Sequence, residues 1–306
     1  MRGKKQKKDV ILFQSKLADN LMNLYYSLTN HTYKHGAYSA FTVSDPKLRN
    51  IHKATVRDRV LHHLICKELY PYFDKKFIYD SYSCRKNKGT HKAINRFKYF
   101  AGKVSRNNSR TCYVLKCDIK KFFANINHEI LLNILDSHIP DKQIMRLLNE
   151  IVSSFHSIHP GVGLPLGNLT SQLFVNIYMN EFDQFVKHGF KIKHYIRYAD
   201  DFVILSNNKK ELENLISPIS EFLFEKLKLQ LHPSKVSVKT LNSGVDFLGW
   251  VNFPKYRILR TATKRRMFRR ITESPTPETL NSYLGLLRWG DAYKLQKEIY
   301  KRKSFL

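Results

Sequence analysis

Two adjacent carboxylates, those of Asp200 and Asp201, interrupt a stretch of β-favouring residues. The residues on either side, 195–198 and 202–205, are aromatic and branched, which predicts two strands joined by a tight turn that carries both acids. Paired acids at a turn repel one another unless a cation lies against them, and divalent cations with oxygen ligands are the usual partners. The pair therefore indicates a metal site, although a lone Asp-Asp is more often an ordinary turn.

A third acid, Asp118, ends another predicted strand, residues 111–119, and precedes Asp200 by 82 residues. A carboxylate there would join Asp200 and Asp201 across a sheet. An acid at the end of a strand is also a common helix cap, and a helix is predicted from Asn127 through Leu135. The three aspartates thus predict a metal site, with a capping role for Asp118 as the alternative.

Two further segments have the composition of ligand-binding loops. Residues 80–93 are polar and cationic, with Arg85 suited to phosphate and Thr90 as the predicted cap of the next helix. Glycines within residues 161–172 would let a ligand approach the start of a helix predicted to reach about Val186. A charged surface loop explains the first segment equally well, and the second is a weak signal when taken alone.

The charge balance points to a polyanionic partner. The 306 residues include 53 Lys and Arg against 25 Asp and Glu, a formal net charge of +28. Such an excess opposes compaction and becomes useful only with a counter-charged ligand, so nucleic acid is the leading candidate. A membrane surface is the rival, yet no run approaches about 18 consecutive apolar residues and no apolar signal core follows the basic N-terminus. We therefore predict a soluble, cytoplasmic protein with no membrane partner.

The four cysteines predict neither a zinc site nor a disulfide framework. Cys66, Cys84, Cys112 and Cys117 lack paired C-x-x-C spacing and lie in apolar or basic surroundings. We expect all four to be reduced and mostly to be packing residues.

The remaining periodicities predict helices and a few strands. After a basic arm at residues 1–9, one amphipathic helix is expected from Val10 to about Asn30. A helix over residues 55–75 is expected to stop at Pro71. The other predicted elements are a hairpin over 37–54 that turns at 44–46, a helical pattern over 209–228 bent or broken at Pro218, a turn at 231–235, strands at 236–238 and 245–251, the second with a glycine break, and a helical lobe over 255–306 with 14 Lys and Arg against 4 Asp and Glu.

Taken in order, these elements resemble a reverse transcriptase over roughly residues 35–290. Several motifs in the correct order are far more specific than any one of them. The motifs are Asp118 with Phe123 five residues on, similar to the first catalytic motif; Leu166 to Gln172, including Gly167, similar to the template-and-nucleotide helix motif; Tyr198-Ala199-Asp200-Asp201, similar to the second catalytic motif; Lys235, at the lysine motif; and Phe247, Leu248, Gly249 and Trp250, at the primer grip.

The resemblance implies an α+β fold shaped as a right-hand polymerase. In it, fingers at 10–108 follow the arm at 1–9, and the palm at 109–254 returns to the fingers over about 127–163. An antiparallel sheet in the palm carries the three aspartates, and residues 255–306 form a short helical thumb.

The resemblance also implies two Mg²⁺ ions, with Mn²⁺ as the alternative, held by Asp118, Asp200, Asp201 and Ile119. Two such ions about 3.5–4 Å apart activate a primer 3′-hydroxyl and stabilise the leaving pyrophosphate.

Further site residues follow from the same resemblance. Arg85 lies on the fingers above the incoming nucleotide, and Leu166, Gly167 and Gln172 lie beside it. Phe123 resembles a steric gate that collides with a ribose 2′-hydroxyl, with a core phenylalanine as the alternative. Lys235 resembles a general acid toward pyrophosphate, with an exposed surface lysine as the alternative.

The helix motif identifies a subclass. Most relatives carry Gln-Gly before this helix and Ser-Pro within it, whereas Leu166-Gly167 and Ser171-Gln172 stand at those places here. That departure, together with residues 81–93 and 282–287, resembles the enzymes of diversity-generating retroelements, within the group II intron-like bacterial type. Those enzymes copy a template RNA with frequent misincorporation opposite adenine, and the mutated cDNA replaces part of a target gene.

The implied partners are template RNA, the primer or cDNA strand, deoxynucleoside triphosphates and a basic oligomeric accessory protein. The alternatives are a retron or group II intron-like reverse transcriptase of ordinary fidelity, or a catalytically silent RNA-binding relative.

Overall fold

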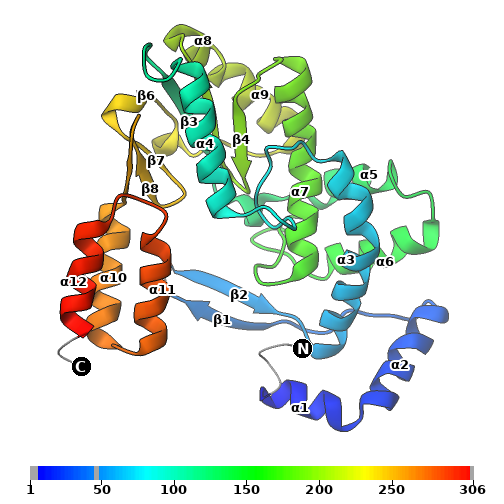
Figure 1. The fold of residues 1–306 in the computed structure, drawn as a ribbon. Coiled ribbons are helices and arrows are strands. Elements are labelled where there is room, and N and C mark those ends of the chain that lie inside the picture. The colour runs from blue at the N-terminus through cyan, green and yellow to red at the C-terminus, as the bar shows by residue number, and fades with distance from the viewer. Residues whose placement is uncertain (1–5, 45–47, 304–306) are drawn as a thin grey trace. The chain divides into compact units, whose positions relative to one another are not determined.

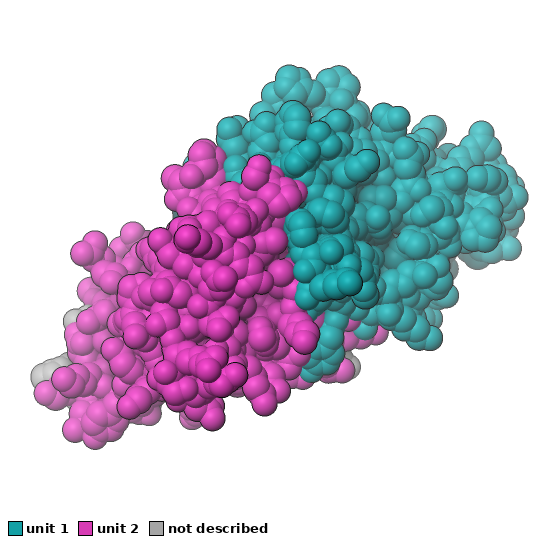
Figure 2. All heavy atoms as spheres, turned by 90° about the horizontal axis from the view of Figure 1, so that it is seen from above, with its two compact units in different colours: residues 1–79, 119–191, 220–231 teal, residues 80–118, 192–219, 232–306 magenta. Residues whose placement is uncertain are grey.

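A computed structural model describes residues 6–44 and 48–303 of the chain (Figure 1). The chain divides into two compact units, each built from three stretches of sequence (Figure 2). Unit 1 comprises residues 1–79, 119–191 and 220–231, and unit 2 comprises 80–118, 192–219 and 232–306. The predicted boundaries of fingers, palm and thumb stay a prediction. Residues 1–5 of the predicted arm and 45–47 at the predicted turn lie outside the described residues.

Unit 1 begins with two helices, α1 (Lys8–Ser15) and α2 (Leu17–Thr29), so the single predicted helix is wrong. The helical conformation is interrupted at Lys16, with φ −126° and ψ 45°. Val10 and Phe13 of α1 pack in a cluster with Val56 at the start of α3, and Leu24 is the buried residue of α2. The last two residues of the predicted arm belong to α1, where Asp9 pairs with Lys53 and Arg59.

The predicted hairpin and the following helix are present. β1 (Ser39–Val43) pairs antiparallel with β2 (Arg49–Lys53), and α3 (Val56–Lys76) begins after its cap Thr55. The predicted stop at Pro71 is wrong, because α3 continues through it. Phe73 is 2% exposed, and its packing holds the last turn although proline cannot donate the backbone hydrogen bond.

The rest of unit 1 is helical. α5 (His128–Asp136) is capped by Asn127, and α6 (Lys142–Ser153), which the sequence patterns missed, is capped by Asp141. α7 (Leu169–Gln184) is buried on most of its circumference and packs against α3 and α5 (Figure 1). A π-helical turn, Phe185–Gly189, ends it close to the predicted limit.

Unit 2 is centred on a four-stranded antiparallel sheet in the order β4-β5-β3-β6. Its strands are β3 (Tyr113–Asp118), β4 (Tyr195–Tyr198), β5 (Asp201–Ser206) and β6 (Ser237–Thr240). α4 (Thr90–Val104) covers one face, where Phe97 and Phe100 pack against Ile196 and Val203 (Figure 1). The predicted cap is wrong: Gly89, at φ 107°, precedes the helix, and Thr90 is its first residue. This sheet is the antiparallel sheet that the sequence predicted for the palm.

Two helices lie between β5 and β6 in the sequence. α8 (Lys209–Asn214) and α9 (Ile216–Leu227) are separated at Leu215, so the predicted interruption lies three residues before Pro218. α9 begins in unit 2 and continues in unit 1. A 3-10 turn, Pro233–Lys235, lies within the turn predicted before β6.

A second sheet of unit 2 corrects the strand predicted at 245–251. β7 (Val245–Phe247) and β8 (Trp250–Asn252) are separate antiparallel strands, and β9 (Arg257–Leu259) joins them. Leu248 at φ 52° and Gly249 at φ 87° form the two-residue turn between β7 and β8. Hairpin turns with two positive φ angles match the twist of the flanking strands, so the glycine reverses the chain instead of interrupting one strand.

The helices of the predicted C-terminal lobe begin at Thr261, and residues 257–259, predicted as part of this helical lobe, form β9 instead. α10 (Thr261–Glu273), α11 (Pro277–Leu287) and α12 (Tyr293–Lys303) pack around Trp250, which is 1% exposed. Within the described residues, no helix has the length and apolar composition needed to cross a membrane.

Candidate active site

The structure brings the three predicted aspartates to one end of the unit 2 sheet. Asp118 is the last residue of β3, Asp201 is the first residue of β5, and the antiparallel register pairs them directly. Asp200 lies in the two-residue turn between β4 and β5, after Ala199 at φ 56°. All three are half-buried.

Asp201 carries the most perturbed carboxyl group of the three. Burial, together with the neighbouring carboxylates of Asp118, Asp200 and Asp246, raises its pKa to about 7, and Lys116 opposes this rise. Its Oδ1 is buried and makes no hydrogen bond, and Lys116 Nζ lies 3.8 Å away. Asp118 is different, because its Oδ1 accepts a 2.8 Å hydrogen bond from Lys235 Nζ.

The donor chemistry at this end of the sheet fits a hard cation. Within residues 6–44 and 48–303, no group of three or more His, Cys, Asp or Glu side chains has the arrangement of a ready metal cage. However, Asp201 has an unsatisfied buried oxygen amid an excess of negative charge, and a bound cation would remove both penalties. Asp118, Asp200 and Asp201 supply the oxygen ligands that Mg²⁺ prefers.

Ile119, the fourth predicted metal residue, offers only its backbone. Its side chain is buried, and it forms an isolated bridge with Leu231 in unit 1. Its place next to Asp118 in the chain is compatible with a carbonyl ligand, and that role stays a prediction.

Lys116 is a site residue that the sequence patterns missed. It precedes Asp118 by two positions, so both side chains lie on one face of β3. Its Nζ donates a 2.7 Å hydrogen bond to the carbonyl of Asp246, whose carboxylate pairs with Arg260. The two-residue spacing from Asp118 was the sequence signal that could have revealed Lys116. Its positive charge lowers the pKa of Asp201, against the effect of burial.

A comparison with known protein families identifies the kind of enzyme to which these aspartates belong. Residues 35–251 match the family described as reverse transcriptase (RNA-dependent DNA polymerase). The chain belongs to this family. The expected enzyme class, an RNA-directed DNA polymerase, is thereby confirmed.

Relatives of this reverse transcriptase include bacterial and intron-encoded proteins. Protein YkfC of Escherichia coli is 26% identical over 276 residues, which cover 78% of this chain and 70% of YkfC. The group II intron-encoded protein LtrA of Lactococcus lactis subsp. cremoris is 21% identical over 289 residues, which cover 72% of this chain and 46% of LtrA.

Solved structures confirm the right-hand polymerase fold. The apo telomerase from Candida tropicalis aligns with a TM-score of 0.56 at 12% identity, covering 72% of this chain and 48% of the telomerase. A telomerase from Candida albicans, solved with a fragment of telomeric RNA, aligns with a TM-score of 0.55 at 10% identity, covering 88% of this chain and 55% of that one. The reverse transcriptase chain therefore spans about half the length of LtrA and of these two structures.

Arg85 of the reverse transcriptase lies in unit 2, in the loop 80–89 before α4. It is half-buried, and its guanidinium donates a 3.1 Å hydrogen bond to the carbonyl of Ser81. The loop also contains positive φ angles at Cys84, Asn87 and Gly89, which bend it tightly. Arg85 thus belongs to the same unit as the aspartates, and nucleotide binding stays its predicted role.

The predicted primer grip is mostly core. The rings of Phe247 and Trp250 are buried, the first against Phe97 of α4 with ring centroids 5.6 Å apart. Leu248 and Gly249, in the turn between them, are only half-buried. Primer contact by this reverse transcriptase is therefore expected from the turn, while the two aromatic rings hold the turn in place.

The predicted nucleotide contacts on the other side of the chain's division lie in unit 1, namely Phe123, Leu166, Gly167 and Gln172, whereas the three aspartates lie in unit 2. Phe123 is half-buried beside buried Phe122, with ring centroids 5.5 Å apart, so it is not a full core residue. The carbonyl of Leu166 accepts a 3.0 Å hydrogen bond from the backbone of β2. Gly167, at φ 108°, leaves no space for a Cβ because Ile51 would lie 2.7 Å from it. Gly167 and Gln172 line a cavity of about 610 Å³.

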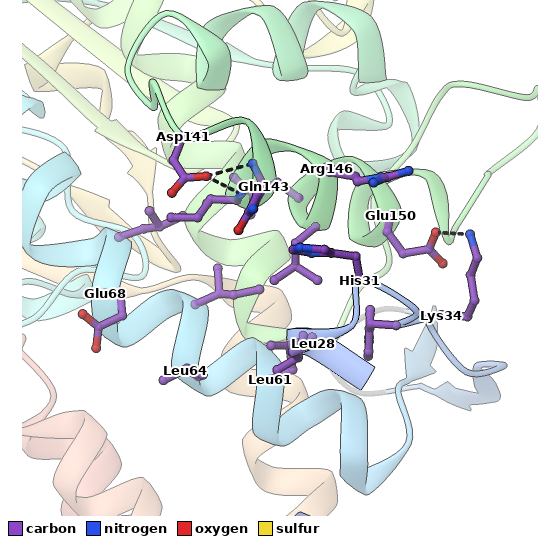
Figure 3. Close-up of a pocket in the computed structure, with 16 residues that line it drawn as sticks. Leu28, His31, Lys34, Leu61, Leu64, Glu68, Asp141, Gln143, Arg146 and Glu150 are labelled. Carbon is purple, nitrogen blue, oxygen red and sulfur yellow. Dashed lines mark hydrogen bonds and ion pairs between the residues drawn. The ribbon is translucent and has the colours of Figure 1, made fainter. Parts of the chain in front are cut away.

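Another cavity of unit 1, of about 540 Å³, has a different character (Figure 3). Its walls are aliphatic side chains of α3 and α6, such as Leu61 and Leu64. Asp141 accepts hydrogen bonds from the start of α6, and Glu150 pairs with Lys34 at 2.9 Å (Figure 3). Because these acids already have structural partners, we do not assign the cavity to the reverse transcriptase site.

Proposed function

We propose that this reverse transcriptase extends a DNA primer on an RNA template, with Asp118, Asp200 and Asp201 as its metal ligands. The observation that carries the proposal is the direct pairing of Asp118 with Asp201, whose Oδ1 is buried without a hydrogen bond. When bound, two Mg²⁺ ions activate the primer 3′-hydroxyl and stabilise the leaving pyrophosphate. The half-buried position of the acids excludes part of the competing water.

Two lysines serve the same reaction. Lys235 Nζ, 2.8 Å from Asp118, holds a proton close to the carboxylates and is the proposed general acid toward pyrophosphate. Lys116 limits the repulsion between the acids, since it opposes the raised pKa of Asp201. Arg85, with its planar guanidinium, is the proposed contact for the nucleotide phosphates. Phe123 is the proposed gate against ribonucleotides.

The partners in this proposal are template RNA, a primer or cDNA strand and deoxynucleoside triphosphates. The formal net charge of +28 supports a nucleic-acid ligand, because Lys and Arg release counterions when they neutralise phosphates. Such synthesis would take place in the cytoplasm.

Primer extension on a defined RNA template with Mg²⁺ tests the proposal. Asp200→Asn and Asp201→Asn are each expected to lower synthesis at least about 10³-fold, since each removes a ligand charge. Binding of the same RNA–DNA duplex, measured by fluorescence anisotropy, is expected to change less than about threefold. Undiminished synthesis by both variants would refute this site, and the RNA-binding alternative would then explain the charge better.

A finer part of the proposal concerns fidelity. We infer from Leu166, at the place where most relatives carry Gln, that copying is error-prone at template adenines, as in a diversity-generating retroelement. Loss of a polar contact beside the nucleotide would loosen selection that rests on differences of about 1–3 kcal/mol. Deep sequencing of cDNA made on one RNA template measures the error spectrum, and Leu166→Gln is expected to reduce errors opposite adenine.

A group II intron-like enzyme of ordinary fidelity is the second candidate. It is favoured by the similarity to LtrA and to the putative COX1/OXI3 intron 2 protein of Saccharomyces cerevisiae, which is 22% identical over 279 residues covering 70% of this chain and 31% of that protein. Equal error rates opposite all four template bases would support it and would exclude the adenine-specific proposal.

The basic oligomeric accessory protein belongs to the diversity-generating proposal. Its presence is expected to raise synthesis on the cognate template RNA without changing extension on a generic template. Equal stimulation of both templates, or of neither, would remove the accessory protein from the proposal.

A further inference from the structure

Arg197 is an unusual residue for the interior of a protein. It lies in β4, three positions before Asp200, and is 0% exposed, which makes it one of the largest fully buried side chains among the described residues. A guanidinium loses its hydration on burial, and hydrogen bonds must replace the lost water contacts. The hydrogen bonds of the buried Arg197 guanidinium therefore indicate its structural role.

One contact holds the turn that carries the catalytic pair. The Nη1 group of Arg197 donates a 3.2 Å hydrogen bond to the carbonyl of Ala199. Ala199 is the residue immediately before Asp200, and its φ of 56° lies in the left-handed region that residues other than glycine seldom adopt. Arg197 thus stabilises a backbone conformation on which the direction of Asp200 depends.

A second contact reaches the loop 80–89. The Nη2 group of Arg197 donates a 3.1 Å hydrogen bond to the hydroxyl of Ser81, which is itself buried. The backbones pair at the same place, because Arg197 N–H donates to the carbonyl of Asp80 at 3.0 Å and Tyr82 N–H donates to the carbonyl of Arg197 at 2.9 Å. The start of the loop is therefore bonded along β4.

The end of the loop is bonded to the same hairpin. Thr90, the first residue of α4, donates from its hydroxyl to the phenol oxygen of Tyr198 at 3.2 Å. Between the two attachments lies Arg85, whose guanidinium bonds back to the Ser81 carbonyl at 3.1 Å. Arg85 and the Asp200–Asp201 turn are thus joined through Ser81 and Arg197.

We propose that Arg197 is a positioning residue that locks the cationic loop 80–89 to the catalytic hairpin. One guanidinium fixes both the turn before Asp200 and the loop that carries Arg85. Groups that bind the phosphates of a nucleoside triphosphate and groups that hold the metal then keep one relative geometry. The inference rests on the proposed polymerase function, and the fully buried Arg197 acts through the backbone of Ala199 and the hydroxyl of Ser81.

Ser81→Ala is the sharpest test, because it removes the side-chain hydrogen bond between the loop and Arg197 and leaves the backbone bonds of Asp80 and Tyr82 to Arg197 in place. In primer extension by the full chain with Mg²⁺, we expect the KM for deoxynucleoside triphosphate to rise about tenfold, as for a lost hydrogen bond to a charged group. We expect kcat to stay within about twofold, because Arg197 still holds Ala199. Ser105→Ala is the matched control, since Ser105 is also buried but bonds within its own turn, and its KM should not change.

Arg197→Lys completes the test. A lysine keeps the charge but not the planar fork that spans both acceptors, so KM should rise and kcat should fall. The double variant with Ser81→Ala should have the same KM as Arg197→Lys alone, because both substitutions remove the same bond. Fully additive effects on KM would overturn the proposal, as would a fall in kcat and Tm with KM unchanged, which marks a purely structural residue.

Hydrogen exchange provides a readout that does not depend on activity. Ser81→Ala should increase the exchange of amides in residues 80–90 and leave those in α10 unchanged, whereas Ser105→Ala should change neither. Unchanged exchange in residues 80–90 would overturn the attachment. An inactive wild-type chain would instead refute the proposed function, and the exchange result would still decide whether Arg197 holds the loop.

Discussion

Asp201 offers a test in which stability and activity change in opposite directions. Burial raises the pKa of its carboxyl from 3.8 to about 7, so the folded state holds this proton to a higher pH than the unfolded chain does. The stabilising effect of the proton is fully present below pH 4 and is lost as the pH rises to about 7. Above that pH, without metal, the folded protein must hold an ionised carboxylate that is poorly solvated.

The magnitude follows from the same shift. Each pKa unit corresponds to about 1.4 kcal/mol, so the ionised carboxylate costs up to about 4 kcal/mol at pH 8. Asparagine removes the charge but still buries a polar group, which costs about 1–3 kcal/mol. For Asp201→Asn we therefore expect a net gain of about 2 kcal/mol at pH 8 in EDTA, or about 4–8 °C in Tm.

Thermal melts at pH 8 and pH 5 in EDTA measure this effect. The gain should vanish at pH 5, where the carboxyl of Asp201 is already neutral in the folded protein, and polymerase activity should be lost. Asp118→Asn is the matched control and should give a smaller gain at pH 8, because it relieves repulsion on Asp201 but also breaks the 2.8 Å pair with Lys235. A lower Tm of the Asp201→Asn variant at pH 8, or the same gain at both pH values, would refute the electrostatic reasoning.

Four further predictions follow from single contacts. Lys235→Gln should lower kcat about 10²-fold in single-nucleotide incorporation, and an unchanged kcat would exclude proton donation by Lys235. Phe123→Val should admit ribonucleotides at least about tenfold better in single-nucleotide incorporation, and equal discrimination would assign Phe123 to packing. Burial lowers the pKa of His62 to about 4, so stability should fall as the pH drops from 6.5 toward 4; His62→Gln should flatten that loss in melts at pH 7 and 5. Gly290→Ala should lower Tm by several degrees, because its Cβ would overlap the ring of buried Trp250, whereas Gly285→Ala, where a Cβ meets nothing, should not.

Local sequence patterns predicted the residues whose conformation depends on their immediate neighbours in the sequence. The hairpin of Asp200 and Asp201 follows from two branched runs around a turn, and the end of β3 at Asp118 follows from another such run. Their meeting was implied by the order of the motifs and is seen in the sheet register.

Features decided by distant partners were missed. A lone arginine in a short strand gives no sign that Ser81, 116 residues earlier, buries it. The continuation of α3 through Pro71 depends on the packing of Phe73, and the reversal at Leu248 and Gly249 depends on the pairing of β7 with β8. In each case tertiary packing overrides a local preference that the sequence pattern reported correctly.

Because the chain alternates between the two units, the strands of the unit 2 sheet are synthesised at widely separated times. The chain changes unit five times, after residues 79, 118, 191, 219 and 231. Strand β3 is made early, but its neighbours β5 and β6 are completed only at residues 206 and 240. At about 5–20 residues per second, the 88 residues from Asp118 to the end of β5 take roughly 4–18 s to make, and until then the nascent Asp118 strand lacks its β5 partner. The ribosome-bound intermediate is therefore the stage at which this enzyme is most exposed to proteases and to unintended strand pairing.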